Sequence, residues 1–420
     1  MALFFYNLFI FFYPLIAKII SPFNLKAKAW VDGRKNIFES IEIKILSDDS
    51  KKIWIHCASL GEFEQGRPLI EKIKEQYPSY KIFLSFFSPS GYQVQKNYQG
   101  ADYIFYLPMD SPSAAKKFFN LINPSLIILV KYEYWYYYLA EAKKRNISIL
   151  LTSGQFIKKF SFFKWYGTIS RQMLGFITHL FVQTENAKEL LSTIGVTNVS
   201  VSGDTRFDRV IEVSSHPKKY KVIDEFCKGH KVFVAGSTWT EDDELVDHFA
   251  NTHPEIKFII APHHINEERL KENEKLYKNV ARLSRLQSSS SKDNMDGVNV
   301  LLIDNIGMLK HLYAYATICY IGGGFGGNGI HNILEAAVYG KPVLFGPENE
   351  NFAEAGDLIE AGGAFEIEDA LQFENLMNEL LQYEDLYNES CKASANYVAA
   401  KAGATQKIMT YIQEKRLLTN

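Results

Sequence analysis

The sequence predicts an α/β protein made of two similar halves, each built on a parallel sheet. Apolar runs of strand length alternate with helical patterns along most of the chain. Such alternation is typical of parallel strands joined by right-handed crossovers. The alternation stops in the polar stretch 216–230 and then begins again, and 420 residues also suit more than one domain. We therefore expect a domain boundary near residue 215.

In the first half, the strongest expected strand is the buried run 53–58. Ahead of it, Ile41, Ile43 and Ile45 alternate with polar residues and predict a weak strand over 41–46. Further strands are expected at 81–87, 103–107, 126–130, 147–151, 179–183 and 199–202, and helices at 63–77, 112–121 and 187–194.

The second half repeats this pattern after residues 216–230, which we interpret as a polar connection. Strands are expected at 231–235, 257–261, 298–303, 316–321 and 342–345, and long amphipathic helices at 373–384 and 387–414. Residues 286–296 contain four consecutive serines and are expected to form a mobile loop.

The N-terminus departs from an ordinary globular composition. Residues 1–17 carry no charged side chain, and the charges that follow are mostly basic: Lys18, Lys26, Lys28, Arg34 and Lys35, against Asp32 alone. The segment lacks the positive start of a signal peptide and is short for a span, which needs about 20 apolar residues. We interpret residues 1–25 as an anchor on a membrane surface, with the basic residues toward the anionic cytoplasmic leaflet. A first helix packed on the domain is the alternative.

Composition excludes some classes of function. The formal net charge of -2 gives no reason to expect a nucleic-acid partner. The four cysteines are widely spaced, which favours reduced thiols in the cytosol over a metal site. His263 and His264 lack the H-E-x-x-H spacing of zinc enzymes, and the sequence has no Asp-x-Asp pair. We therefore expect neither a catalytic metal nor a cofactor.

A glycine-rich stretch between two expected strands, residues 322–329, is the first candidate site. Glycines there allow backbone N–H groups and a helix start to face an anion such as phosphate. Two overlapping G-x-G-x-x-G patterns fit this run, so that dinucleotide fingerprint is weak evidence, and a plain tight turn is the alternative. His331, Asn332 and Glu335 follow directly, and a second polar group, 348–351, follows the next strand. Both groups belong at the carboxyl edge of one parallel sheet, where α/β proteins bind ligands.

Two carboxylates in the first half are the next candidates. Glu62 follows the strand 53–58 at a glycine turn, where it could accept a proton from a substrate hydroxyl or simply interact with a helix N-terminus, whose dipole should keep it ionised. Glu133 lies among aromatic residues after another strand, which suits a sugar or ordinary core packing. Lys131 beside it could pair with an acidic group. In the second half, Gly236-Ser237-Thr238 is another possible phosphate contact or an ordinary helix cap.

Several separate motifs, in order, resemble one known family, the 3-deoxy-D-manno-octulosonic acid (Kdo) transferases of lipid A biosynthesis. The resemblance runs over nearly the whole chain. It rests on the apolar N-terminus and on residues 59–62, 133–135, 203–208, 236–238, 304–307, 329–335, 346–347 and 351–352. The chain departs from the family at Lys131, where Glu is usual, after Trp135, where Pro-Asn is usual, and at His263, where Arg is usual.

The resemblance implies a GT-B fold with two Rossmann-like domains facing a central cleft. The implied divisions are an anchor over 1–25, an acceptor-binding domain over 26–215 and a nucleotide-sugar-binding domain over 216–420. The implied reaction transfers Kdo from CMP-Kdo to a lipid A precursor of the lipid IVA type, with inversion and without a metal, at the cytoplasmic face of the inner membrane.

The resemblance also implies roles for particular residues. Glu62 matches the general base that would deprotonate the acceptor hydroxyl. The expected acceptor-binding residues are Ser59, Gly61, Lys131 and Glu133. The expected donor-binding residues are Gly236, Ser237, Thr238, Pro262, His263, Gly322, Gly323, Gly324, Gly327, Asn328, Gly329, His331, Asn332, Glu335 and Asn351.

Three other functions remain open from the residues alone. One is a membrane-associated GT-B transferase that uses a UDP-sugar. Another is an NAD(P)-dependent oxidoreductase, which needs the glycine fingerprint to open the cofactor domain and an acid such as Glu348 at the ribose. The third is a non-catalytic binding protein at the membrane, in which Glu62 is only a first-turn residue.

Overall fold

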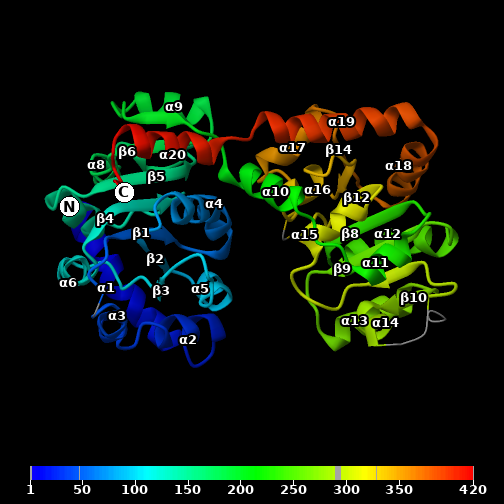
Figure 1. Ribbon diagram of the computed structural model, residues 1–420, viewed down its shortest axis with the longest axis horizontal. Coiled ribbons are helices and arrows are strands. Elements are labelled where there is room, and N and C mark those ends of the chain that lie inside the picture. Colours follow the sequence, from blue (N-terminus) through cyan, green and yellow to red (C-terminus); the bar gives the residue numbers. More distant parts are fainter. Residues whose placement is uncertain (1, 47, 289–294, 328, 420) are drawn as a thin grey trace. The chain divides into compact units, whose positions relative to one another are not determined.

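The computed structural model describes residues 2–46, 48–288, 295–327 and 329–419, and the chain forms two compact units. Unit 1 comprises Met1–Arg209 and Ala402–Asn420, and unit 2 comprises Val210–Lys401 (Figure 1). Each unit has one parallel seven-stranded sheet with helices on its faces. The expected α/β class and the two parallel sheets are therefore confirmed.

The sheet of unit 1 has the order β3-β2-β1-β4-β5-β6-β7, with β1 in an interior position. Its strands are β1 Lys52–Cys57, β2 Lys81–Phe86, β3 Tyr103–Tyr106, β4 Pro124–Val130, β5 Ser148–Gly154, β6 His179–Val182 and β7 Val199–Val201. Alternate residues of β1 face opposite sides. Trp54 packs in the core cluster on one face, and Ile53 and Ile55 pack in the cluster on the other.

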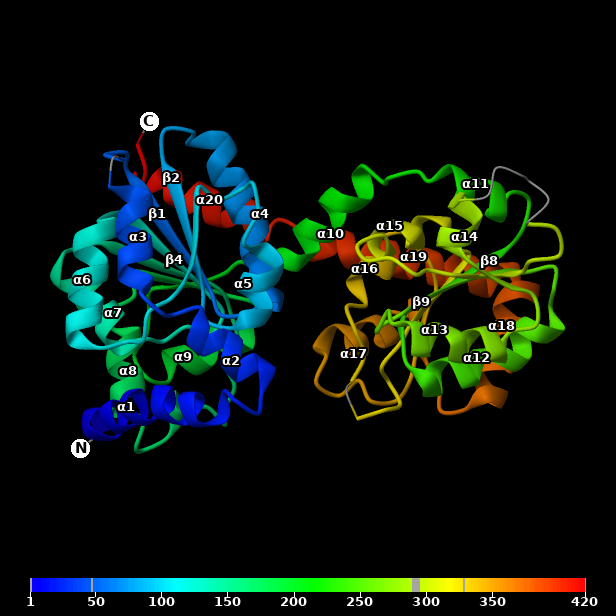
Figure 2. The same ribbon diagram turned by 90° about the horizontal axis from the view of Figure 1, so that it is seen from below.

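The helices of unit 1 cover both faces of this sheet (Figure 2). They are α1 Ala2–Ile20, α2 Leu25–Asp32, α3 Ile37–Ile45, α4 Leu60–Gln76, α5 Pro89–Gln95, α6 Pro112–Ile122, α7 Tyr136–Lys144, α8 Thr168–Leu174, α9 Glu185–Ser192 and α20 Ala404–Glu414, with a 3-10 turn at Ser161–Phe163. Helix α10, Thr205–Ser215, begins in unit 1 and ends in unit 2.

The strand expected over 41–46 is wrong, because these residues lie in or just after helix α3. Ile41 and Ile45 are four residues apart and both are buried in the core, whereas Ile43 is 76% exposed. A spacing of four places two side chains on one helix face. The buried pair therefore fits a helix better than the alternation of Ile41, Ile43 and Ile45 with polar residues fits a strand.

Unit 2 repeats the layered arrangement with the order β10-β11-β9-β8-β12-β13-β14. Its strands are β8 Val232–Thr238, β9 Lys257–Pro262, β10 Val280–Arg282, β11 Val300–Leu302, β12 Ile318–Ile321, β13 Val343–Phe345 and β14 Ala364–Glu366. Its helices are α11 Lys221–Cys227, α12 Thr240–Thr252, α13 Glu267–Leu276, α14 Leu283–Ser288, α15 Leu309–Leu312, α16 Leu334–Ala337, α17 Ala353–Glu360, α18 Ala370–Gln382 and α19 Glu384–Ala400, with a 3-10 turn at Tyr313–Tyr315.

Two connections differ from the expectation. The stretch 216–230 contains helix α11, because Ile223 and Phe226 are buried against unit 2 and give the polar segment an apolar face. Of the expected loop 286–296, residues 286–288 belong to α14, and 289–294 lie outside the described residues.

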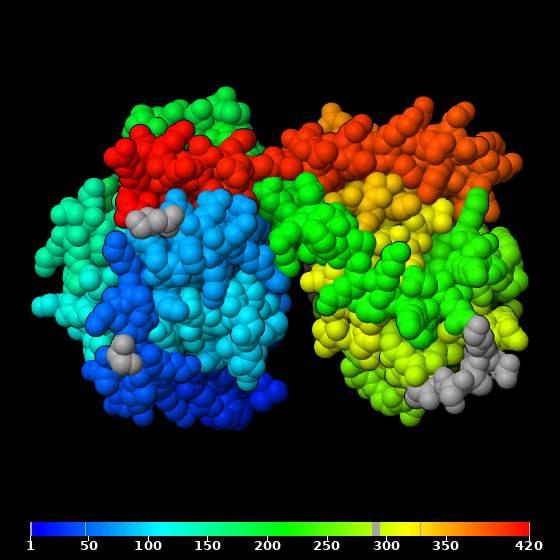
Figure 3. Space-filling model, in the orientation of Figure 1, coloured from blue at the N-terminus to red at the C-terminus, as the bar shows by residue number. Residues whose placement is uncertain are grey.

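The single helix expected over 387–414 is in fact two helices, α19 and α20, separated at Gly403, whose φ is 98°. The expected assignment of 402–420 to the C-terminal domain also needs correction. Ile408, Met409 and Ile412 of α20 lie in a hydrophobic core cluster of unit 1. Figure 3 shows the C-terminal residues, in red, on the unit that carries the blue and cyan N-terminal segments.

Helix α1 packs on unit 1 with one face and exposes the other. Tyr6, Ile10 and Tyr13, spaced four and three residues apart, face the unit: Ile10 is buried, Tyr6 donates a hydrogen bond to Asp110, and Tyr13 packs on Trp30. The exposed side is almost entirely apolar: Phe4, Phe5, Leu8, Phe9, Phe11, Phe12, Leu15, Ile16, Ile19 and Ile20. Among the described residues, α1 is the one helix long and apolar enough to cross a membrane.

Candidate functional site

The expected acceptor residues lie at the carboxyl edge of the sheet in unit 1. Strands β1 and β4 are paired in parallel, so the turns that follow them, at Ser59 and Lys131, lie on the same edge. Glu62 is in the first turn of α4, where the backbone N–H of Ser59 donates to its Oε2 at 2.9 Å and the Ser59 hydroxyl lies 3.3 Å away. Glu62 therefore helps to cap α4, and this capping does not depend on any catalytic role.

Glu133 is buried and held by two donors. Its Oε2 accepts from His56 Nε2 and from Trp135 Nε1, each at 2.7 Å. His56 is fully buried in β1, and its Nδ1 lies 2.8 Å from the Ser85 hydroxyl, which in turn accepts from Trp54 Nε1 at 2.7 Å. Nδ1 also lies 3.0 Å from the Ser85 carbonyl oxygen, so both oxygens of Ser85 contact this nitrogen. These contacts hold the His56 ring between Ser85 and Glu133.

His56 was not among the site residues predicted from the sequence. The signal was present, because His56 is the one polar side chain inside the apolar run 53–58. A buried polar group inside a central strand needs hydrogen-bond partners, and here these are Ser85 and Glu133.

The environment of Glu62 makes its carboxylate a stronger base than usual. Burial raises the pKa of Glu62, the negative charge of Glu133 raises it further, and His56 and Ser59 oppose the shift. The expectation that the helix dipole keeps Glu62 ionised left out burial and Glu133, which both raise its pKa. A raised pKa suits a group that must take a proton from a hydroxyl.

The other two expected acceptor residues differ in their surroundings. Gly61 is exposed, and a side chain placed there would meet nothing within 4 Å. Lys131 adopts a left-handed backbone conformation with φ 68°, and its Nζ lies 5.4 Å from the ring centroid of Tyr132. Such a contact is favourable for a cation at the face of an aromatic ring.

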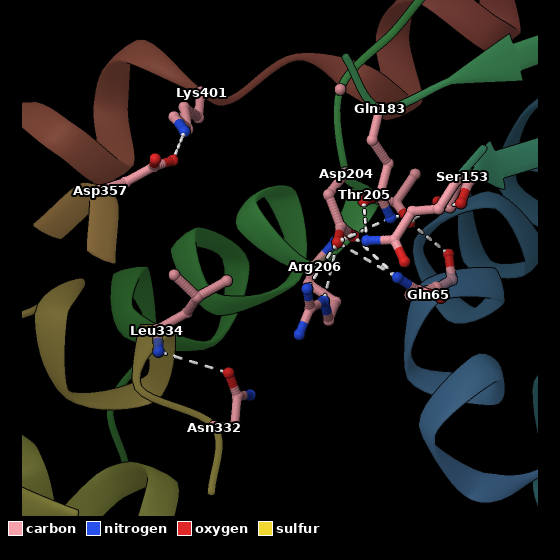
Figure 4. A network of polar contacts seen from close by, with 12 residues as sticks. Gln65, Ser153, Gln183, Asp204, Thr205, Arg206, Asn332, Leu334, Asp357 and Lys401 are labelled. Atoms are coloured by element: carbon pink, nitrogen blue, oxygen red, sulfur yellow. Dashed lines mark hydrogen bonds and ion pairs between the residues drawn. The ribbon is translucent and has the colours of Figure 1, made fainter. Parts of the chain in front are cut away.

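A second polar network, shown in Figure 4, fixes the start of α4 against the end of β7. The carboxylate of Asp204 accepts from Gln65 of α4 at 3.1 Å, from Gln183 at 3.1 Å and from Arg206 at 2.8 Å. Asp208, in the same motif, caps α20 by accepting from the backbone N–H of Gly403 and Thr405, each at 2.6 Å. The motif 203–208 thus has a clear structural role.

In unit 2, three sequence motifs meet at one edge of the sheet. Strands β9, β8 and β12 are neighbours, which places Pro262-His263, Gly236-Ser237-Thr238 and Gly322 side by side. The backbone N–H of His263 donates to the Thr238 carbonyl, and that of Gly322 donates to the Gly236 carbonyl, each at 2.9 Å. The expected donor residues of these three motifs are therefore brought together.

Aromatic rings line this edge. The His263 ring stacks on Trp239 at 4.8 Å on one side and on His331 at 4.5 Å on the other, measured between centroids. Burial lowers the pKa of His331 to about 4, and burial lowers the pKa of His263 as well. Near neutral pH both rings are uncharged. The buried Nε2 of His331 has no hydrogen-bond partner among the described residues, so it can serve a ligand.

The glycines of the loop are required by backbone packing. A Cβ on Gly322 would lie 2.4 Å from the Ser237 carbonyl oxygen, and one on Gly324 would lie 2.6 Å from the Gly346 Cα. Gly323 has φ 98°. Asp242, which was not among the predicted site residues, accepts from the Gly323 N–H at 2.9 Å and from the Tyr320 hydroxyl at 2.7 Å. The tight-turn interpretation therefore accounts for part of the glycine content.

The rest of the loop is more open. Gly327 donates its N–H to Glu348 at 2.6 Å, and a Cβ there would meet nothing within 4 Å. Gly329, with φ 73°, lies close to the Phe352 ring. Asn332 donates to Glu335 at 3.2 Å, whereas Asn351 is exposed before α17. Asn328 lies outside the described residues.

Two expectations attached to this loop need correction. The helix after it, α16, has only four residues, so a helix N-terminus contributes little to anion binding here. The loop follows β12, the fifth strand of unit 2, whereas the oxidoreductase alternative needs it after the first strand. The Glu348 carboxylate, which that alternative needs at the ribose, already accepts a hydrogen bond from the Gly327 N–H.

Comparison with known proteins identifies relatives over most of the chain. Residues 34–209 match the family described as 3-Deoxy-D-manno-octulosonic-acid transferase (kdotransferase). The predicted resemblance to the Kdo transferase family is confirmed. A Kdo transferase of Aquifex aeolicus is 29% identical over 78% of this chain and 86% of its own length, and one from Haemophilus influenzae is 25% identical over 86% of each. A bifunctional glycosyltransferase/methyltransferase of Fusobacterium nucleatum is 29% identical over 77% of this chain, which spans about half, 52%, of that protein.

Solved structures share the fold. A UDP-GlcNAc 2-epimerase from Neisseria meningitidis matches with a TM-score of 0.62 at 16% identity, covering 86% of this chain and all of that one. MurG from Acinetobacter baumannii matches with a TM-score of 0.53 at 12% identity, covering 87% of this chain and 99% of that one. With the two parallel sheets, these matches confirm the GT-B fold expected from the Kdo transferases.

Proposed function

We propose that this protein is an inverting Kdo transferase that moves Kdo from CMP-Kdo to the hydroxyl of a lipid A precursor. The observation that carries the proposal is Glu62, a partly buried carboxylate with a raised pKa at the carboxyl edge of unit 1, in a chain related to Kdo transferases. A glycosyltransferase without a metal needs a base of this kind to activate its acceptor.

Unit 1 would supply the acceptor chemistry. Glu62 would take the proton of the acceptor hydroxyl as its oxygen forms a bond to the anomeric carbon of Kdo. Glu133, held by His56 and Trp135, would strengthen this base, because it is one of the groups that raise the pKa of Glu62. Ser59, Gly61 and Lys131 are the proposed acceptor-binding residues around this edge.

Unit 2 would supply the donor chemistry. As the bond between the anomeric carbon and the CMP phosphate breaks, the leaving group gains negative charge that backbone N–H groups can stabilise. The flat stack of Trp239, His263 and His331 and the free Nε2 of His331 support a nucleotide ligand at this edge. The donor-binding residues named from the sequence remain the proposed set, with Asn351 the least supported because of its exposed position.

The test is a transfer assay with purified full-length protein, CMP-Kdo and a tetraacylated disaccharide precursor. Product mass should increase by Kdo units while CMP is released. Glu62→Gln should lower turnover by at least about 100-fold, the usual size of a lost general base, while the melting temperature still rises with CMP. Glu75→Gln is the matched control, because Glu75 is exposed on the same helix and loses the same charge.

A folded protein that forms no Kdo-bearing lipid contradicts the proposal. Selective thermal stabilisation by UDP, with no effect of CMP, would instead favour the UDP-sugar alternative. Unchanged turnover in Glu62→Gln would assign Glu62 to capping α4 only.

For localisation, we propose attachment to the cytoplasmic face of the inner membrane through α1. The exposed hydrocarbon and aromatic side of this helix supports attachment, and its polar contacts on the other side favour a helix that lies on the bilayer. Protein that stays in the soluble fraction of cells at physiological salt would contradict this assignment.

A further inference from the structure

A cavity of about 680 Å³ lies in unit 1 beside the C-terminal half of α1. It is formed by α1, α2, the segment that joins α2 to α3, the start of α3, and α6 with the residues before it. Figure 2 shows α1 and α2 together along one side of the unit. Its volume is in the range of small-molecule sites. Four of its lining residues are cationic, Lys18, Arg34, Lys35 and Lys117, against one acid, Glu39.

Arg34 is the most unusual group in this cavity. Its guanidinium donates to the carbonyls of Leu107 at 2.9 Å, Trp30 at 3.2 Å and Phe87 at 2.8 Å. It also faces the rings of Trp30 and Phe87, at 4.1 and 4.8 Å. No carboxylate among the described residues neutralises it, and burial lowers the pKa of Arg34 to about 9. A partly buried cation without a counter-ion is costly, and an anion from outside would offset that cost.

Two further observations indicate a polar ligand. A guanidinium has five N–H donors, and the three carbonyls leave two of them for another acceptor. Trp30, which also lines the cavity, is 6% exposed, and its indole N–H has no hydrogen-bond partner among the described residues. Buried donors of this kind are normally satisfied.

The three lysines have different roles. Lys18 is in the last turn of α1, and Lys117 is exposed on α6 with its Nζ 5.0 Å from the Phe38 ring centroid. Lys35 is partly compensated, because its Nζ lies 2.7 Å from Asp32. Lys18 and Lys117 have no ion pair with a carboxylate among the described residues, so their charges are available to a ligand.

We propose that this cavity binds the anionic phosphate group of a membrane lipid. Arg34 and the indole N–H of Trp30 would contact the phosphate oxygens, and Lys18 and Lys117 would add charge from the rim. The apolar exposed side of α1 beside the cavity identifies the source as a lipid, because acyl chains can lie along it while the phosphate enters the cavity.

The test follows the indole N–H signals of the five tryptophans by NMR in the full chain. The signal of Trp30 is assigned as the one that disappears in Trp30→Phe. The probe is dihexanoylphosphatidylglycerol below its micelle concentration, compared with dihexanoylphosphatidylcholine and with inorganic phosphate. We expect the Trp30 signal to shift with the anionic lipid at concentrations where the zwitterionic lipid has no effect.

Variants on the rim make the test specific. Lys18→Gln/Lys117→Gln should weaken lipid binding about tenfold, from the loss of two charges near the phosphate. Lys26→Gln/Lys116→Gln is the matched control, because both lysines are exposed on α2 and α6 outside the cavity. This double variant should change binding less than twofold.

The proposal is overturned if the Trp30 signal responds to neither anion, or if Lys18→Gln/Lys117→Gln binds like the wild type. A response to inorganic phosphate without one to the lipid overturns the lipid assignment. The assay needs no turnover, so its result is independent of the proposed transferase activity.

Discussion

At the scale of single residues, the charge of Glu133 is the feature that distinguishes Glu62 from an ordinary helix cap. Glu133→Gln keeps an oxygen that can accept from His56 and Trp135 but removes the negative charge. The pKa of Glu62 should then fall, since Glu133 is one of the causes that raise it. A base works only when deprotonated, so activity declines as pH falls through its pKa. We expect the acid limb of the kcat/KM profile to move to lower pH in Glu133→Gln.

The control for this prediction is Glu64→Gln. Glu64 lies on α4 as Glu62 does, but it is not among the groups that raise the pKa of Glu62. An acid limb that stays in place in Glu133→Gln would mean that Glu133 does not act on the base, or that another group sets the profile.

We expect His56 to hold the Glu133 carboxylate in place and not to transfer a proton to the substrate. His56→Phe keeps a ring in β1 but leaves Glu133 and the Ser85 hydroxyl each short of one partner in a buried region. Each unsatisfied group costs about 1–3 kcal/mol, so unit 1 should lose stability and Tm should fall by several degrees. His179→Phe provides the comparison, because His179 is only half-buried and makes a single side-chain hydrogen bond, to Ser200. Equal melting temperatures for the two variants would contradict the role of His56.

At the scale of elements, helix α7 has its N-terminus capped by side chains from distant parts of the chain. Asp110 accepts from the N–H groups of Tyr137 and Tyr138, at 2.9 and 3.0 Å, and the Tyr6 hydroxyl accepts from Tyr136 at 3.0 Å. Burial raises the pKa of Asp110 from its usual 3.8 to about 6. The folded protein thus holds this proton more tightly than the unfolded chain does.

This shift gives a stability change with a defined sign. The stability linked to Asp110 is fully present below about pH 4 and is lost as pH rises through about 6. Asp110→Asn cannot titrate, so its Tm relative to the wild type should improve between pH 4 and pH 7, on top of a constant loss from the altered cap. Thermal melts across this range test the slope, and parallel Tm curves for the two proteins would contradict it.

The glycine loop of unit 2 provides a prediction about backbone packing. Gly322→Ala would bring a Cβ within 2.4 Å of the Ser237 carbonyl oxygen, so β8 and the loop must separate. We expect a loss of at least about 2 kcal/mol in the stability of unit 2 and a loss of CMP binding. Gly356→Ala in α17 is the control, since a Cβ there meets nothing within 4 Å and alanine favours a helix. Thermal shift with CMP measures both effects, and normal CMP binding by Gly322→Ala would contradict the placement of this loop in the donor site.

At the scale of the whole molecule, the sequence predicted the alternating α/β pattern well, because buried parallel strands appear as short apolar runs. It failed where local pattern and tertiary packing disagree: Ile41 and Ile45 read as a strand and form a helix, and Ile223 and Phe226 bury a segment that is otherwise polar. The return of α20 to unit 1 depends on long-range packing of Ile408 and Ile412, which no local signal records.

The candidate site was predictable to a similar degree. The sequence placed the glycine loop and the polar group 348–351 at one sheet edge, and the strands before them, β12 and β13, are paired. It did not predict that Glu62 and Glu133, or Gly322 and His263, lie at a common edge. The sequence could not show which buried partners tune these groups. His56 and Asp242 act through contacts between residues 77 and 81 positions apart, and such contacts become visible only in the folded chain.

The cap on α7 has a practical consequence for work with the purified protein. Apolar N-terminal helices are often cut away to obtain a protein that needs no detergent. Here that cut would remove the Tyr6 hydroxyl, and with it the acceptor for the first N–H of α7 and the donor to Asp110. Helix α7 follows directly on Glu133 and Trp135. A shortened protein that dissolves readily but turns over slowly would then reflect a frayed α7, and detergent with the intact chain is the better preparation.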